Sequence, residues 1–403
     1  MKKEIDINTM SLMLGITKPW ILYKAETDEN MDLHVYVKFE RGSKFACAEC
    51  EKKCPVYDTK EKTWRHLNCF EHKTFIHCKV PRIKCDKHGV HMVDVPWANG
   101  STGFTILFEN FVMQLAQKMP VLAISKLLGE NNGRLWRRIH RYADEYVEKI
   151  DCSNVTKIGL DETSRKGHDY ITVFIDLDTS RVIYIADGKK KSNIDEFKKF
   201  FESHNGKAEN ITDVTCDMSM GFISGIKRAF PNSKITFDKF HVIKLVNEAV
   251  DNVRRKEVAE QPILKQSRYV WLKNKSNLNE KQNEKFIKMS KMNLKTGKAY
   301  RLKIAFQDIY NTNYSRDFAE MEFNEWIQWA IRSKLPEFKS VAKTIGMKME
   351  GILNYFESKL TNAVLEGTNS MIQSIKSRAR GFKTLENFKA MIYLMNSEHC
   401  IVG

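Results

Sequence analysis

The sequence lacks the features of an exported or membrane-embedded protein. It has no run of 18 apolar residues, and its first residues do not show the charged-then-apolar pattern of a secretory signal. We therefore expect a cytoplasmic chain, where disulfides are rare. The nine cysteines are an odd number, which favours free thiols and metal ligands over a disulfide framework.

Acidic residues are in deficit. The 50 Asp and Glu face 66 Lys and Arg, which leaves a net charge of +16. Such an excess favours a polyanionic partner, because counterions released from phosphates drive binding. Nucleic acid is the leading candidate, and a basic membrane-surface protein is the competing interpretation. With 42% apolar and 11% aromatic residues in 403, the chain can form real cores, and at roughly 100 to 200 residues per domain it predicts two to four folded units.

A cysteine-rich segment near the N-terminus predicts a zinc ribbon. Cys47 and Cys50 form a CxxC hook, and Cys85 and His88 form a CxxH hook of the same shape. Two hooks separated by strand-like sequence can supply four tetrahedral ligands. The alternative is a set of unrelated reduced thiols and a surface histidine. The neighbouring candidates that leave the ligand set open are Cys54, Cys69, Cys78 and His72.

Three helices are predicted after the ribbon. Apolar residues recur at helical spacing from Phe104 to Ala116, a second helix covers Val121–Leu128 and stops at Gly129, and a third runs from about Arg134 to Val147. The last two resemble a helix-turn-helix, whose second helix can reach bases in the major groove. A plain three-helix bundle with a solvated basic face is the alternative. The third helix carries four arginines: Arg134, Arg137, Arg138 and Arg141.

The middle of the chain alternates between strands and helices in an informative order. Strands are expected at 156–164, 169–177 and 181–186, followed by a helix at 194–204, a strand at 211–216, a helix at 223–230 and a strand at 234–237. This order is typical of a ribonuclease-H-like fold. In that arrangement Asp161 on the first strand and Asp217 at the end of the fourth come close together.

Four short motifs then resemble one family. Segments 159–162, 215–219, 237–241 and 362–369, which contain Asp161, Asp217, His241 and Glu366 in turn, are similar to motifs of the DDE transposases of the ISL-three insertion-sequence family. The basic segment 376–383 and the pair Asn387-Phe388 extend the likeness. The family also has a zinc ribbon and a helix-turn-helix, so the resemblance covers most of the chain.

The resemblance implies that Asp161, Asp217 and Glu366 are the catalytic, metal-binding triad. Phosphoryl transfer on DNA uses two divalent cations, and carboxylate oxygens suit Mg²⁺ or Mn²⁺. Glu162, next to Asp161, should point the other way along the strand. His241 is a further catalytic candidate and Asp238 a weaker one, and the alternative is that His241 only caps or packs at the start of a long helix from Val242 to about Glu260.

The sequence between Asp217 and Glu366 is longer than the core fold needs. The segment from about Glu260 to Thr344 is helical in pattern and rich in Lys and Trp, which indicates an inserted helical domain. Trp326 and Trp329 are three residues apart and could share one helical face. A packed Trp pair is the favoured interpretation, and stacking on an unpaired base is the alternative.

These observations predict a multidomain α+β and α/β protein. The expected parts are a zinc-ribbon region (1–98), a helix-turn-helix domain (99–150), a ribonuclease-H-like core (151–259), a helical insertion (260–345) and the C-terminal core helices with Glu366 (346–403). The expected function is metal-dependent cleavage and strand transfer at the terminal inverted repeats of a bacterial insertion sequence, by a homo-oligomer on double-stranded DNA. A non-catalytic DNA-binding regulator and a ribonuclease-H-like nuclease or resolvase are the alternatives. Besides the third helix, the expected DNA contacts are Lys376, Arg378, Arg380 and Lys383.

Overall fold

The structure, a computed structural model, describes residues 7–100, 102–190, 192–312, 314–358 and 363–397. Backbone contacts divide the chain into two compact units. One comprises Met1–Tyr146 together with Ile375–Gly403, and the other comprises Val147–Ser374. No helix of the described residues is both long and apolar enough to cross a membrane.

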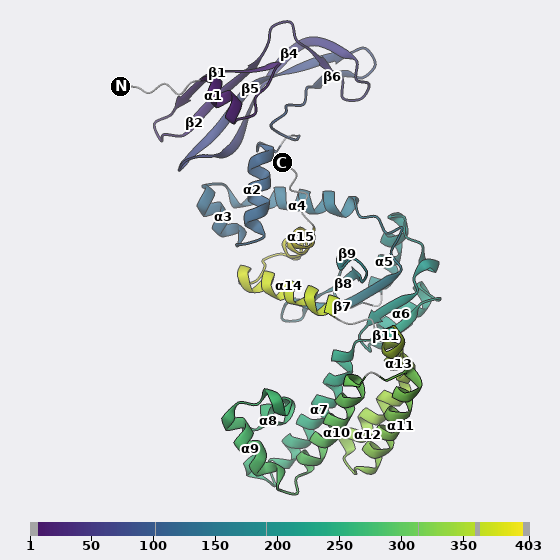
Figure 1. Ribbon diagram of the computed structural model, residues 1–403. Coiled ribbons are helices and arrows are strands. Elements are labelled where there is room, and N and C mark those ends of the chain that lie inside the picture. Colours follow the sequence, from purple (N-terminus) through teal and green to yellow (C-terminus); the bar gives the residue numbers. More distant parts are fainter. Residues whose placement is uncertain (1–6, 101, 191, 313, 359–362, 398–403) are drawn as a thin grey trace. The chain divides into compact units, whose positions relative to one another are not determined.

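The first unit begins with a short helix, α1 (Ile7–Met13), and a six-stranded sheet (Figure 1). The strand order is β1-β2-β5-β4-β3, with β6 paired to β5. One face of the sheet is apolar and closes over a core that includes Trp20, Trp64 and Trp97. The predicted metal module is therefore one end of a larger sheet. The strands are β1 (Trp20–Thr27), β2 (Leu33–Phe39), β3 (Lys44–Ala46), β4 (Lys53–Cys69), β5 (His72–Cys85) and β6 (Gly89–Met92).

Three helices follow in the same unit, as predicted. They are α2 (Ile106–Ala116), α3 (Val121–Leu128) and α4 (Asn132–Glu148). The hydroxyl of Thr105 caps the N-terminus of α2, and α3 ends at Gly129 in the left-handed conformation that favours glycine.

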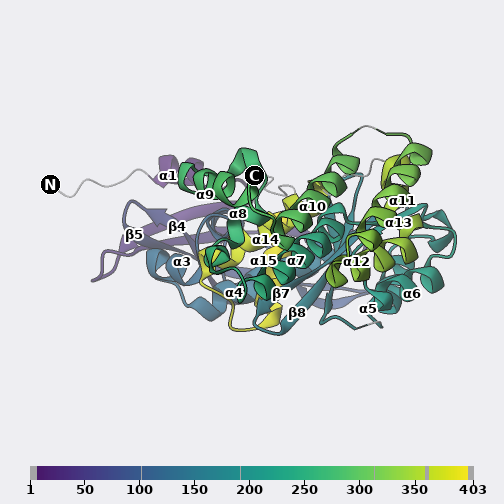
Figure 2. The ribbon, with the colours of Figure 1, turned by 90° about the horizontal axis from the view of Figure 1, so that it is seen from below.

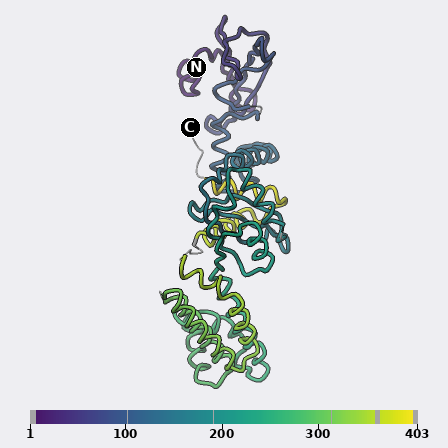
Figure 3. The backbone as a smooth tube through the Cα atoms, turned by 90° about the vertical axis from the view of Figure 1, so that its right-hand side faces the viewer, coloured from purple at the N-terminus to yellow at the C-terminus, as the bar shows by residue number. Residues whose placement is uncertain are grey.

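The C-terminal segment belongs to this first unit as well. Helix α15 (Leu385–Asn396) contacts α4 and the end of α2: the side chains of His140 and Asn387 form a hydrogen bond of 2.7 Å, and the amide of Gln117 donates to the carbonyl of Leu394 at 3.4 Å. Figure 3 follows this yellow segment along the chain trace. A chain segment distant in sequence thus completes the core of the helix-turn-helix.

The second unit contains a five-stranded sheet of order β11-β10-β7-β8-β9. β7, β8 and β9 are antiparallel, whereas β10 runs parallel to both β7 and β11. The order of three strands, helix, strand, helix and strand is the one predicted from the sequence. The elements are β7 (Lys157–Lys166), β8 (Asp169–Asp176), β9 (Arg181–Asp187), α5 (Ser192–Ser203), β10 (Asp213–Cys216), α6 (Met220–Ala229) and β11 (Lys234–Phe237).

The rest of the second unit is helical. Helix α7 (Lys239–Glu257) packs against α10 and α12, which lie beside it in Figure 2. The helices after it are α8 (Arg268–Leu272), α9 (Glu280–Ser290), α10 (Lys295–Asn311), α11 (Arg316–Arg332), α12 (Pro336–Met347), α13 (Met349–Ser358) and α14 (Ala363–Ala379).

The two tryptophans of α11 have different environments. Trp326 is buried, and its indole N–H donates to the carbonyl of Leu302 at 2.8 Å. Trp329 is 40% exposed. The expectation of a packed Trp pair is therefore correct for Trp326 and wrong for Trp329, because a three-residue step moves round the helix and carries Trp329 out of the buried face.

Candidate active site and zinc centre

Two aspartates of the second unit have equivalent positions along neighbouring strands of its sheet. In the parallel pair of β7 and β10, Thr215 lies opposite Gly159. Asp217 is two residues beyond Thr215, and Asp161 is two residues beyond Gly159. Since neighbouring strands are about 4.8 Å apart and side chains alternate, we expect both carboxylates on the same side of the sheet, Asp217 just beyond the C-terminal end of β10.

Helix α14 brings Glu366 toward these aspartates by a close packing contact. A Cβ at Gly159 would lie 2.9 Å from a methyl of Leu365, so the absence of a side chain at 159 lets the helix approach the strand. Leu365 is buried and Glu366, the next residue, is exposed. One turn further on, the amide of Asn369 donates to Asp161 at 2.5 Å. Leu365 and Asn369 thus fix α14 on β7, with Glu366 between them.

Asp238 and His241 also border this place. Asp238 is the N-cap of α7 and accepts from the backbone N–H of Phe240. His241 Nε2 lies 3.8 Å from Asp238 and 4.0 Å from Asp161. Burial raises the pKa of Asp238, and the charge of Asp161 adds to this, while His241 opposes it. Asp238 therefore has a structural role at the helix start, whereas His241 lies beside a candidate metal ligand.

Three lysines surround the acidic residues. Lys189 Nζ lies 2.8 Å from Glu162 and over the ring of Tyr170. Partial burial acts against its charge, but the contact with Glu162 and the charges of Tyr170 and Asp217 raise the pKa of Lys189. Lys348 donates to the carbonyl of Met218, next to Asp217, at 2.8 Å.

The third lysine, Lys239, lies near Glu366. Its pKa is lowered by burial, and the charge of Glu366 opposes that shift. Burial likewise lowers the pKa of Lys348, against the nearby Cys216 and Asp217. Cations on three different segments therefore lie near Asp217 or Glu366.

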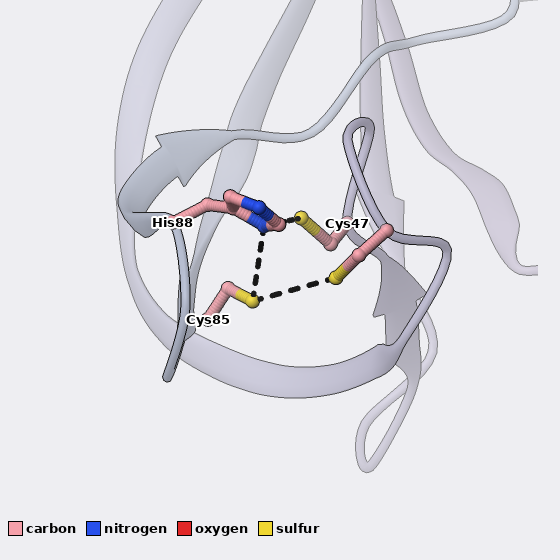
Figure 4. Close-up of side chains that lie close together, drawn as sticks. Cys47, Cys85 and His88 are labelled. Carbon is pink, nitrogen blue, oxygen red and sulfur yellow. Dashed lines mark hydrogen bonds between the residues drawn. The ribbon is translucent and has the colours of Figure 1, made fainter.

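The four predicted zinc ligands meet in the first unit (Figure 4). His88 Nδ1 lies 3.5 Å from the sulfur of Cys47 and 3.6 Å from that of Cys85, and the sulfurs of Cys50 and Cys85 are 3.7 Å apart. Around tetrahedral zinc, with Zn–S of about 2.3 Å and Zn–N of about 2.0–2.1 Å, ligand separations are about 3.5 to 3.8 Å. The observed distances fit a Cys₃His zinc centre.

Local hydrogen bonds prepare this centre for a cation. The backbone N–H groups of Lys87 and His88 lower the pKa of Cys85 to about 6. The thiols of Cys47 and Cys85 raise the pKa of His88. Thiolate is the metal-binding form of cysteine, so the lowered pKa of Cys85 favours zinc at neutral pH, whereas His88 must lose its proton to bind the ion. Cys54, Cys69, Cys78 and His72 are outside the group of four.

The arginines of α4 have unequal surroundings. Arg134 Nη1 lies 2.9 Å from Glu130, and its guanidinium covers the ring of Phe104. Arg138 Nε lies 2.9 Å from Glu109, whose side chain is only 3% exposed. Arg141 pairs with Glu145 at 2.9 Å. Arg137 is exposed and has no ion pair among the described residues, so its guanidinium is the most available for DNA.

The basic segment after Glu366 also has mixed surroundings. Arg378 donates to the carbonyl of Gln117 at the end of α2 and contacts the sulfur of Met395. It lines a cavity of about 260 Å³ together with Trp136, Phe382 and Lys383. Arg380 is exposed, with a φ of 52°, so its side chain projects from the turn that ends α14.

Among the described residues, the zinc ligands form the one group of three or more potential ligands within 4.8 Å of one another. Asp161, Asp217 and Glu366 come from neighbouring elements but do not form such a group. Residue 362 of the last motif lies outside the described residues. Sequence reasoning missed Lys189, Lys348 and Asn369. Of these, only Asn369 had a signal, because it lies in the quoted motif one helical turn after Glu366.

Comparison with known proteins defines the class. Residues 158–392 match a DDE transposase family of the ISL3 type, described as "Transposase". Residues 93–143 match the "Helix-turn-helix domain of transposase family ISL3", and residues 43–88 match the "zinc-finger of transposase IS204/IS1001/IS1096/IS1165". The catalytic part is thus that of a DNA phosphoryl-transfer enzyme. The chain belongs to the ISL3 family of transposases, as its motifs predict.

Two curated relatives align along nearly the whole chain. The transposase for insertion sequence element IS1557 of Mycobacterium tuberculosis is 26% identical over 434 residues, covering 98% of this chain and 96% of that protein. The transposase for insertion sequence element IS1001 of Bordetella parapertussis is 26% identical over 376 residues, covering 90% and 91%. The alignments therefore cover at least nine tenths of this chain and of both relatives.

Proposed function

We propose that this transposase cleaves and rejoins DNA strands at the terminal inverted repeats of its insertion sequence, with Asp161, Asp217 and Glu366 as catalytic carboxylates. The observation that carries the proposal is the convergence of β7, β10 and α14. The parallel register of β7 and β10 supports pairing the two aspartates, and the Leu365–Gly159 contact, which packs α14 against β7, supports adding Glu366 to them. Three acidic oxygen donors from three segments fit a divalent-cation site.

The residues of the site have distinct roles in this proposal. Two Mg²⁺ or Mn²⁺ ions held by the triad would activate the attacking hydroxyl and stabilise the leaving 3′ oxygen. Asn369 orients the Asp161 carboxylate through its hydrogen bond. Lys189 and Lys239 direct positive charge toward the scissile phosphate. His241 lies where it can contact the same phosphate.

DNA recognition is assigned to the other parts of the chain. The zinc centre stabilises its sheet, and α4 enters the major groove with Arg137 as the principal base contact and Arg134, Arg138 and Arg141 as supports or phosphate contacts. Lys376, Arg378, Arg380 and Lys383 contact the DNA backbone. Of the five-part domain division given by the sequence, the last part is divided in this proposal: its residues up to Ser374 remain with the catalytic core, and those from Ile375 onward join the helix-turn-helix. A homo-oligomer holds two DNA ends.

The test compares Asp217, directly after β10, with Asp213, the first residue of that strand. Asp217→Asn should abolish cleavage of a duplex carrying the transposon end while leaving its affinity for that duplex unchanged, because the change removes charge at the catalytic edge. Asp213→Asn, at the opposite end of β10, is the matched control and should cleave at the wild-type rate. Normal cleavage by Asp217→Asn would remove this residue from the site. A wild-type protein that binds ends but never cuts would favour the regulator instead.

A further inference from the structure

The outer face of α11 has a composition unlike the rest of this basic protein. The buried face of the helix is formed by Ala319, Phe323, Trp326 and Ala330. On the opposite face every side chain is exposed, and four of them are large and apolar: Phe318 at 57%, Met321 at 47%, Trp329 at 40% and Ile331 at 44%. The residues along a shallow surface groove on this face are Asp317, Glu320, Met321, Asn324, Glu325, Gln328, Trp329 and Arg332.

The charges on this face are uncompensated. Asp317, Glu320 and Glu325 form no ion pair with other described residues, and neither does Arg332. Three acidic residues around exposed apolar side chains would repel DNA phosphates, although the chain as a whole has a charge of +16. The face therefore suits a protein partner, and stacking of Trp329 on a DNA base is disfavoured.

The order of residues along the face is self-complementary. Consider two copies of α11 laid antiparallel, with a two-fold axis that passes between Asn324 and Glu325. Asp317 of one copy then lies beside Arg332 of the second copy, and the two side chains can form an ion pair. Phe318 and Trp329 lie on the same flank of the helix, so Trp329 lies beside Phe318 of the second copy, an apolar contact. The same operation brings Met321 to Gln328 and the Asn324 amide to the Glu325 carboxylate. Each of the four pairings is favourable, and each occurs twice.

We propose that the outer face of α11 is a symmetric dimerisation surface, which pairs with the same face of a second copy of this chain. A two-fold interface needs one patch that complements itself, and the 317–332 stripe meets that requirement. The surface does not depend on the chemistry proposed for the triad. It gives the homo-oligomer a defined contact, far along the chain from both the zinc centre and α4.

The area of the outer face of α11 limits the affinity of the dimer. Sixteen residues of helix are about 24 Å long, and one helix pair buries less than the roughly 800 Å² per partner of a standard stable interface. Reversible association in the micromolar range is therefore expected for the free protein. Two transposase molecules bound to the ends of one DNA would associate more tightly, because tethering raises their effective concentration.

Charge reversal provides the test. Sedimentation velocity of the full-length, zinc-loaded protein without DNA should show a monomer–dimer equilibrium for the wild type. Asp317→Arg places arginine opposite Arg332 of the second copy, and Arg332→Asp places aspartate opposite Asp317, so each variant alone should remain monomeric. An equimolar mixture of the two should dimerise again, because the mixed dimer has the original Asp317–Arg332 pair at one contact and an ion pair of the two substituted side chains at the other. Glu280→Arg, an exposed change on α9, is the control and should dimerise like the wild type.

The outcomes separate the alternatives. Wild-type protein that stays monomeric at every concentration overturns the proposal, as do single variants that dimerise normally. Monomeric single variants whose mixture does not dimerise overturn the antiparallel pairing. All substituted side chains are exposed, and circular dichroism verifies that each variant is folded. End cleavage is not part of the readout, so failure here leaves the proposed chemistry untouched.

Discussion

Arg137 and Arg138 are adjacent in sequence, yet their substitution by alanine should have different consequences. Arg138 Nε lies 2.9 Å from Glu109, which is 3% exposed. Arg138→Ala leaves that carboxylate buried without its cation, a change that typically costs about 3 to 5 kcal/mol. Burial already raises the pKa of Glu109 against the opposing effect of Arg138. Protonation of Glu109 therefore limits the loss, and about 3 kcal/mol is expected near neutral pH.

The pH dependence has a definite sign. Without Arg138 the pKa of Glu109 rises further above its unfolded value, so the free-energy penalty grows as the pH rises through that pKa and shrinks as the pH falls. Glu109→Gln in the Arg138→Ala background should recover most of the stability, because it removes the buried charge. Arg137→Ala should leave the stability of the fold unchanged and cost about 1 to 3 kcal/mol in binding to the cognate end.

Thermal unfolding across pH, combined with titrations on cognate and scrambled duplexes, measures both effects. The reasoning is refuted if Arg138→Ala unfolds like the wild type at pH 7, or if Glu109→Gln gives no recovery. Arg137→Ala that weakens both duplexes equally would make Arg137 a phosphate contact, with sequence recognition located elsewhere.

Two further predictions concern the first unit. Elemental analysis of the purified protein should find one zinc per chain. Cys85→Ser or a chelator should unfold the β1–β6 sheet, which circular dichroism measures, and should weaken binding to end DNA. Metal-free protein with an intact sheet would contradict this prediction. Burial and Arg65 lower the pKa of His66 to about 4, so the buried ring must be neutral. Relative to an unfolded pKa of about 6.5, it contributes stability of about 3 kcal/mol that is lost as the pH falls from about 6.5 toward 4. His66→Gln should flatten that part of the stability–pH curve, and an unchanged slope would show that another group controls it.

The elements that could be predicted are those with local signals. Strand and helix periodicity, together with capping residues such as Thr105 and Gly129, gave the order of the core and of α2–α4. The zinc ligands were predictable because both hooks are short-range patterns. The expectation that Asp161 and Asp217 lie near each other came from the strand order alone, because parallel strands of such a sheet end at the same edge.

The features that could not be predicted depend on tertiary contacts. The sequence of α4 shows four similar arginines, and only the packing of α2 reveals that Arg138 faces the buried Glu109. The C-terminal segment looked like part of the catalytic core because it follows Glu366, but its contacts from Ile375 onward are with the helix-turn-helix. Likewise, the exposure of Trp329 depends on which side of α11 the neighbouring helices cover.

The most direct test of the central claim replaces a proposed cation ligand by a softer one. Asp217→Cys should not cleave end DNA with Mg²⁺, which prefers oxygen, and should recover cleavage with Mn²⁺, which tolerates sulfur better. Asp213→Cys, at the start of β10, is the control and should cleave with either cation. Recovery with Mn²⁺ at position 217 alone is the result expected if Asp217 binds the catalytic cation. Wild-type cleavage by Asp217→Cys in Mg²⁺ would contradict that assignment.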